Sequence, residues 1–144
     1  MKYNLPGRYL LDTNVLSEIR KPRGHAGVKT FVNSIREEDL FISVLSVGEI
    51  SYSIEKFQAG PKKTELALWL TQKLSVRFGS RIIPLDTEIM IEWGRIQART
   101  KNLPVIDSLI AATALARRFT VVTRNVKDFK MIEGIGLYNP WEDV

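Results

Sequence analysis

The sequence contains no cysteine and only one histidine among its 144 residues. Without cysteine, the chain can form no disulfide, no thiolate nucleophile and no zinc–thiolate site. A Ser-His-Asp triad or a site with several histidine ligands would depend on His25. His25 lies in PRGHAG, whose proline and glycines predict an exposed loop with a solvated imidazole. Any hydrolytic chemistry must therefore rest on carboxylates, hydroxyl groups and a hard metal ion.

Long apolar runs are also missing. No stretch approaches the ~18 consecutive apolar residues of a membrane helix, and the start, MKYNLPGRYLL, lacks the apolar segment of a signal peptide. We therefore expect a cytoplasmic protein with no membrane partner. Positive charge is in excess, with 21 Lys and Arg against 16 Asp and Glu. This balance favours nucleic acid or an acidic protein segment as partner, and a basic surface with no dedicated partner is the alternative.

The order of the apolar segments predicts one α/β domain. Short apolar runs typical of buried strands occur at RYLLDT, LFISVLS, RIIPLD, TVVTRN and GLYNPW. Helical patterns separate them, and a hairpin of two helices over 47–78 follows the second strand. This alternation predicts a mostly parallel central sheet flanked by helices. We expect an N-terminal extension over residues 1–7 and the domain over residues 8–144.

Acidic residues stand where several of these segments end. Asp12 ends the first predicted strand, Glu49 lies early in the helix after the second strand, and Asp107 lies in the first turn of the helix before the fourth strand. Strand ends and the helices that follow them meet at one edge of a parallel sheet. Clustered carboxylates there would repel one another unless a cation lies between them, and oxygen ligands suit Mg²⁺ or Mn²⁺. Further polar residues follow the fourth strand: Thr123, Arg124, Asn125 and Asp128.

Each acid also has a purely structural explanation. Asp12 could cap the helix that follows it, and Ser46 with Glu49 matches the S-x-x-E capping box. Asp107 could serve the helix dipole, and Asp128 could cap a turn. Capping alone does not explain why all of these acids fall at positions that are expected to converge.

Five motifs, in a fixed order, carry a resemblance to a known family. They are LLDTNVLSE at 10–18, SVLSVGEI at 43–50, DSLIAATAL at 107–115, VVTRNVKDF at 121–129 and the terminal YNPWED. Together they extend over nearly the whole chain. The sequence resembles the PIN-domain ribonucleases and, within them, the VapC toxins of type II VapBC toxin–antitoxin pairs, in particular the FitB-like branch.

This resemblance implies a toxin endoribonuclease that hydrolyses RNA phosphodiester bonds with Mg²⁺, for which Mn²⁺ can substitute. Asp12, Glu49 and Asp107 match the three acidic metal-site positions of the family, and Asp12 and Asp107 are the expected direct ligands. Glu49 is expected to orient the attacking water or to accept its proton. Thr13 and Thr123 match hydroxyl groups beside the site, and the family pattern implies products with 5′-phosphate and 3′-hydroxyl ends.

Three further residues complete the predicted site. The fourth acidic position of many family members falls on Asn125, and this departure leaves one fewer charge to hold a second metal ion. Asp128 is expected to contribute to the acidic site indirectly. Arg124 lies within the site motif, so we predict that it binds the substrate, as Thr13 does.

The resemblance also implies partners. We expect a homodimer that binds a cognate VapB-type antitoxin, with operator DNA contacted only through the antitoxin complex. The antitoxin is expected to cover the active site with its C-terminal segment. The hairpin from Val47 to Phe78 is the predicted antitoxin groove because its apolar positions are numerous for a surface element. They include Ile54, Phe57, Leu68 and Leu74.

Basic and aromatic residues add two expectations. One basic group follows the first strand and another lies near the last strand of the predicted sheet. Both are expected to reach a phosphate backbone at the site edge, and a solvated face is the alternative. The two groups are Arg20, Lys21 and Arg23, and Arg117, Arg118, Arg124, Lys127 and Lys130. Trp69 and Trp93 fall at helical apolar spacing and predict core positions, whereas Trp141 is expected to pack at the chain end.

Three other functions fit part of the pattern. A phospho-receiver domain would need paired acids after the first strand and a lysine after the last, and DTN and TRN provide neither. A haloacid-dehalogenase-type phosphatase would need D-x-D-x-T, and DTN lacks the second aspartate. A catalytically silent PIN-like RNA-binding or regulatory module would keep the fold without the activity. The intact set of acids disfavours this last alternative, because negative charge that faces phosphates weakens binding.

Overall fold

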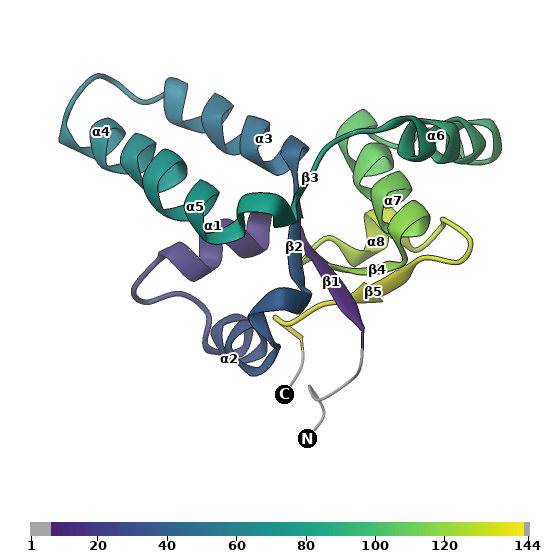
Figure 1. The fold of residues 1–144 in the computed structure, drawn as a ribbon, viewed down its shortest axis with the longest axis horizontal. Coiled ribbons are helices and arrows are strands. Elements are labelled where there is room, and N and C mark those ends of the chain that lie inside the picture. Colours follow the sequence, from purple (N-terminus) through teal and green to yellow (C-terminus); the bar gives the residue numbers. More distant parts are fainter. Residues whose placement is uncertain (1–6, 143–144) are drawn as a thin grey trace.

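The computed structural model describes residues 7–142 and forms a five-stranded sheet between two layers of helices (Figure 1). The predicted extension, apart from Gly7, and Asp143 of the last motif lie outside the described residues. All strand pairs are parallel, so the expected mostly parallel sheet is entirely parallel, in the order β3-β2-β1-β4-β5. The strands are β1 Arg8–Leu11, β2 Leu40–Ser43, β3 Ile82–Ile83, β4 Phe119–Val122 and β5 Gly136–Tyr138.

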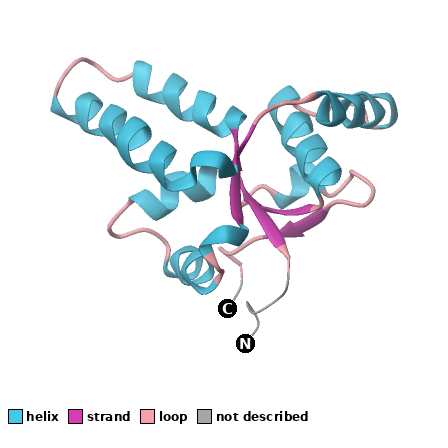
Figure 2. Ribbon diagram, viewed as in Figure 1, coloured by secondary structure: helices cyan, strands magenta, loops and turns pink. Residues whose placement is uncertain are grey.

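The first helices cover one face of the sheet and the last helices cover the other, as Figure 2 shows. On the first face lie α1 Thr13–Arg20, α2 Ala26–Ser34, α3 Val44–Glu55, α4 Pro61–Leu68 and α5 Ser75–Phe78. On the second face lie α6 Thr87–Arg99, α7 Val105–Arg117 and α8 Val126–Phe129. Short 3₁₀ turns, η1 Glu37–Asp39 and η3 Gly79–Arg81, precede β2 and β3. None of the helices described here is long and apolar enough to cross a membrane.

Two hydrophobic cores follow from the alternation of side chains along the strands. Tyr9 and Leu11 belong to the core beneath α1 to α5, and Leu10 belongs to the core beneath α6 and α7. Successive residues of a strand point to opposite faces, so a sheet buried on both sides needs apolar residues at every position. This requirement explains the unbroken apolar run that predicted β1, and it fixes the point where the run ends in an aspartate.

The observed strands end earlier than the apolar runs that predicted them. Ser43 caps α3, since its Oγ accepts a hydrogen bond from the Leu45 amide at 3.0 Å, and the helix therefore begins directly after β2. Pro84 follows β3 and has no amide hydrogen to continue the ladder. The early start of α3 places Glu49 in its second turn, so the capping-box explanation for Glu49 is wrong.

The predicted second helix of the hairpin is present, but it is not uniform. A π-helical segment, η2 Trp69–Leu74, joins α4 to α5, and the Ser75 hydroxyl donates to the Leu70 carbonyl at 2.7 Å within this region. Of the predicted groove residues, Ile54 and Leu74 are buried in the first core, whereas Phe57 and Leu68 are exposed by 44% and 54%. The predicted apolar surface of the hairpin is therefore narrower than its sequence suggests.

Candidate active site

The carboxyl ends of β1 and β4 bring Asp12 and Thr123 together. The two strands are neighbours, and the Asp12 amide continues their ladder by donating to the Val122 carbonyl at 2.9 Å. The Thr123 hydroxyl donates to Asp12 Oδ2 at 2.8 Å, and the Thr13 amide donates to Asp12 Oδ1 at 2.8 Å. Asp12 is only 6% exposed and Thr123 is fully buried. Asp12 thus caps α1, as one explanation of its position predicted, and it is also the buried acid of the predicted site.

Glu49 reaches the same edge from α3. The Thr13 hydroxyl donates to Glu49 Oε1 at 2.6 Å and lies 2.9 Å from the Ser46 hydroxyl oxygen. A hydroxyl group has one proton to donate, and the short contact to a carboxylate is the stronger use of it. Thr13 therefore holds Glu49 in place, which is a different task from the direct substrate contact predicted for Thr13.

Asp107 completes the acidic cluster from the first turn of α7. Burial is the largest cause that raises the pKa of Asp107, and the negative charges of Asp12, Asp128 and Glu49 add to it in that order, so that together they raise it to about 6. Burial also raises the pKa of Asp12, and Glu49 adds to this, against the hydrogen bonds from Thr123 and Thr13. Like charges have such effects only at short range. The structure therefore brings together the four acids that sequence analysis expected to converge.

Asn14 is a site residue that sequence analysis did not single out. Its side-chain amide donates to the Thr123 hydroxyl at 3.3 Å, and its Oδ1 accepts from the Arg124 amide at 3.3 Å. The Asn125 amide also donates to the Thr123 hydroxyl at 3.0 Å. Because Thr123 accepts from both, its own proton is directed to Asp12. The place of Asn14 in the DTN motif, directly after Asp12 and Thr13, was the signal in the sequence.

The donor set suits a hard cation, although the acids do not yet surround one point. Among residues 7–142, no three Asp, Glu, His or Cys side chains are grouped closely enough to hold a metal ion as they stand. The negative charges of Asp12, Asp128 and Glu49 nevertheless act on Asp107, and with its burial they raise its pKa. Their oxygen atoms are the ligands that Mg²⁺ and Mn²⁺ prefer. Asp12, Asp107 and Glu49 therefore fit a divalent cation in the chemistry of their ligand atoms.

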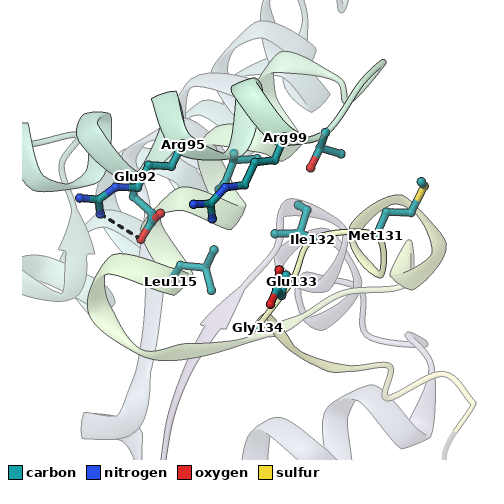
Figure 3. Close-up of a pocket in the computed structure, with 10 residues that line it drawn as sticks. Glu92, Arg95, Arg99, Leu115, Met131, Ile132, Glu133 and Gly134 are labelled. Carbon is teal, nitrogen blue, oxygen red and sulfur yellow. Dashed lines mark ion pairs between the residues drawn. The ribbon is translucent and has the colours of Figure 1, made fainter.

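A cavity of about 450 Å³ lies elsewhere, between α6, the end of α7 and the segment after α8 (Figure 3). Its lining includes Arg95, Arg99 and Glu133, but none of the predicted site residues. Glu92 lies 3.9 Å from Arg95 and offsets its charge. This cavity is thus separate from the acids.

Two sequence-based expectations about basic and imidazole groups are wrong. His25 is not a solvated loop residue, because it caps α2, with Nδ1 accepting from the Val28 amide at 3.3 Å. Arg117 and Arg118 precede β4 and therefore lie at the opposite edge of the sheet from the acids, where Arg117 forms an ion pair with Asp86. Residues that come before a parallel strand cannot reach the edge where that strand ends.

Removing the charge of Asp107 is expected to stabilise the metal-free protein at neutral pH. Its carboxyl group has a pKa of about 6 in the folded chain against a usual value of 3.8. Stability from this group is therefore full below about pH 4 and is lost as the pH rises through about 6. For a fully buried group this change corresponds to about 3 kcal/mol, and the partial exposure of Asp107 reduces it to about 1 kcal/mol.

Urea unfolding in EDTA tests this expectation. Asp107→Asn should exceed the wild-type protein in free energy of unfolding at pH 7.5 and should match it at pH 4. Glu88→Gln, an acid in the first turn of α6, serves as the control for loss of a carboxylate. An equal difference between Asp107→Asn and wild type at both pH values would contradict the assignment of a strained charge to Asp107.

Comparison with known proteins supports the same relationship as the motifs. The family model described as PIN domain matches residues 9–134. The toxin FitB of Neisseria gonorrhoeae is 33% identical over 138 residues, which cover 93% of this chain and 99% of FitB. The VapC ribonuclease Y4jK of Sinorhizobium fredii is 29% identical over 137 residues, which cover 92% of this chain and 97% of the relative.

Solved structures extend the likeness to three dimensions. The crystal structure of FitAcB from Neisseria gonorrhoeae matches with a TM-score of 0.87 and 31% identity, over 94% of this chain and 99% of that one. Other structures of this fold include a toxin–antitoxin complex. Since the family model spans most of the chain and FitB is similar throughout its length, this chain belongs to the PIN-domain family, with relatives named VapC ribonuclease and FitB toxin.

Proposed function

We propose that this protein is a toxin endoribonuclease that hydrolyses RNA phosphodiester bonds with a divalent cation held by Asp12, Asp107 and Glu49. The observation that carries the proposal is the convergence of these carboxylates from three separate elements, where burial and the neighbouring negative charges together raise the pKa of Asp107 to about 6. Such a raised pKa is typical of functional sites. Relatives named ribonucleases and the basic net charge of +5 support RNA as the substrate class.

A bound Mg²⁺ or Mn²⁺ would supply positive charge to the scissile phosphate. It would also lower the pKa of a bound water molecule, so that hydroxide is available at neutral pH. The carboxylate of Glu49, held by the Thr13 hydroxyl, orients the attacking water and accepts its proton. The Thr123 hydroxyl holds Asp12 in the orientation that ligation needs. Asp107 is mostly ionised above its pKa of about 6, so it can serve as a ligand at neutral pH.

Asn125 limits the charge of the site. Asp12, Glu49 and Asp107 carry three negative charges, of which one divalent cation neutralises two. Asn125 adds none, and Asp128 acts from the first turn of α8 through its charge on Asp107. We infer that the free enzyme holds one ion, and that any second ion arrives with the RNA phosphate.

Cleavage of single-stranded RNA tests the proposal. The purified protein should cut RNA with Mg²⁺ or Mn²⁺, should stop when EDTA is added, and should leave 5′-phosphate and 3′-hydroxyl ends. Readdition of Mg²⁺ in excess over EDTA is the control and should restore cutting. Undiminished cleavage in EDTA would contradict the metal-site assignment. RNA binding without cleavage under any of these conditions would favour the silent binding module instead.

A groove beside the acids supports an antitoxin as the partner. A hollow of about 160 Å³ runs from Thr13 along α1, α3 and α4 and is lined by Ile50, Phe57, Leu66 and Trp69 among others. An apolar helix of the antitoxin would fit there, and a segment continuing to Thr13 would place a basic side chain among the acids. The homodimer and the contact with operator DNA through the antitoxin belong to the same proposal. A tight antitoxin complex that keeps full ribonuclease activity would contradict it, and a monomer by light scattering would contradict the dimer.

A further inference from the structure

Three residues that are far apart in the sequence gather beside the acid site. The guanidinium of Arg124 lies over the ring of Trp141, with 5.4 Å between its central carbon and the ring centroid. The His25 ring lies 6.2 Å from the Trp141 ring, tilted by 44°. Arg124 follows Thr123 directly, so this group adjoins the residue that holds Asp12. Neither the chemistry of the acids nor the antitoxin groove uses it.

The backbone on either side of the Arg124 side chain is fixed. Its amide donates to Asn14 at 3.3 Å, and its carbonyl accepts from the Asn139 side chain at 3.4 Å. The side chain itself is exposed, and no carboxylate within residues 7–142 forms an ion pair with it. An arginine paired with carboxylates would have its guanidinium occupied and not free to contact a ligand. Arg124 therefore presents a positioned and unneutralised guanidinium at the edge of the site.

The position of Trp141 is fixed by a backbone hydrogen bond and by packing against the core. Its amide donates to Asn139 Oδ1 at 2.9 Å, and its ring packs against the first core. The preceding carbonyl, of Pro140, approaches α2 so closely that a Cβ at Gly27 would lie 2.7 Å from it. The C-terminal segment thus passes close along α2, as the trace in Figure 1 shows. Packing of this kind holds the indole in place, and the Arg124 guanidinium lies over it.

We propose that Arg124, supported by Trp141, is a stacking site for one nucleobase of the RNA strand next to the scissile phosphate. The inference rests on the proposed function, because it takes RNA as the ligand of the acid site. Unpaired bases stack on aromatic rings and on arginine guanidinium planes, and such contacts tolerate every base. A positive charge that only attracts phosphate needs neither a fixed plane nor an aromatic support. Arg124 is the binding residue, and Trp141 is a positioning residue that acts through it.

The groups that surround this platform suit a nucleotide. Lys127, three residues after Arg124, adds positive charge to the same segment. Glu18, the acid beside His25, is engaged, because its carboxylate accepts from the His25 amide at 2.7 Å and lies 3.5 Å from the Lys21 ammonium. Two other acids are close in sequence: Glu142 follows Trp141, and Asp128 lies four residues after Arg124. The antitoxin groove begins on the Thr13 side of α1, whereas the platform lies on the Asn14 side.

Fluorescence anisotropy in EDTA separates stacking from charge, because no cleavage is expected there. The two probes are a labelled 12-nucleotide oligouridylate and a 12-unit ribose-phosphate chain of the same charge without bases. The wild-type protein should prefer the oligouridylate by about tenfold, the worth of one stacked base. Arg124→Lys keeps the charge but not the plane, so it should bind both chains equally, with the affinity of wild type for the chain without bases. Arg124→Gln should weaken binding of both.

Two further variants complete the design. Trp141→Leu should lose the preference for bases while Trp141→Phe retains most of it, and circular dichroism verifies that both fold. Lys62→Gln removes a positive charge far from the site and should keep the preference. A wild-type protein that binds neither chain, or that binds both equally, overturns the platform, as does a full preference in both Arg124→Lys and Trp141→Leu. RNA cleavage in Mg²⁺ is scored separately: a protein that cuts without the preference contradicts only the platform, and one with the preference that never cuts contradicts only the proposed nuclease.

Discussion

Asp107→Asn is expected to reduce RNA cleavage by roughly 10³-fold while the protein stays folded, a loss that corresponds to several kcal/mol of charge stabilisation. The substitution keeps the shape of the side chain and removes its negative charge. Asp107 bears a charge that its surroundings disfavour, since burial and three neighbouring acids raise its pKa to about 6. No such charge would be kept for the fold alone. The loss should therefore appear in activity and not in stability.

Asp12→Asn should have a similar effect on cleavage, with an added cost to the fold. Asp12 accepts hydrogen bonds through both of its oxygens, from Thr13 and Thr123, and an amide can accept through only one. Steady-state cleavage rates with Mg²⁺ and urea unfolding separate the two effects. Glu88→Gln is the matched control and should cut at the wild-type rate. Wild-type cleavage by Asp107→Asn would remove the basis for the metal site.

Thr123→Val is the second substitution with a large expected effect. It replaces a buried hydroxyl, which accepts from Asn14 and Asn125 and donates to Asp12, by a methyl group of the same size. Loss of a group that orients a metal ligand typically lowers activity or metal affinity by about 10- to 100-fold. Asn14, Asn125 and Asp12 would each lose a hydrogen bond to Thr123, which should also lower the free energy of unfolding by about 1–3 kcal/mol.

Thr123→Ser is the control for this prediction because it restores the hydroxyl and removes only a methyl group. Thr123→Ser should recover most of the cleavage rate at saturating Mg²⁺. It should also return the Mg²⁺ concentration that gives half the maximal rate to near its wild-type value. If Thr123→Val lost stability but kept both quantities at their wild-type values, Thr123 would support the fold and not the site.

The sequence predicted the inner strands β1, β2 and β4 well because their apolar residues are buried beneath both helical layers. Shorter apolar runs correspond to the edge strands β3 and β5, whose residues are less buried. The strand ends were less predictable. Strand β2 ends at Ser43 because Ser43 caps the next helix, and β3 ends before Pro84 because proline has no amide hydrogen. Hydrophobic periodicity indicates neither of these ends.

The convergence of the acids was predictable, whereas the contacts around them were not. Asp12, Glu49 and Asp107 occupy strand ends and helix starts, and topology alone brings such positions to one edge. The bridge through Asn14 and the packing of His25 against Trp141 depend on side-chain orientation between distant segments. No periodic pattern encodes such contacts. Placing Arg117 at the site edge was an avoidable error, because it precedes the strand whose far end forms the site.

The central claim is that three carboxylates together hold one divalent cation, and calorimetric titration with Mn²⁺ tests it most directly. The wild-type protein, without RNA, should bind one Mn²⁺ per chain, and more weakly as the pH falls below about 6, where Asp107 takes up a proton. Asp12→Asn and Asp107→Asn should lose this ion, whereas Glu88→Gln should bind it as wild type does. Absence of binding by the wild-type protein at millimolar Mn²⁺, or undiminished binding by both variants, would contradict the account.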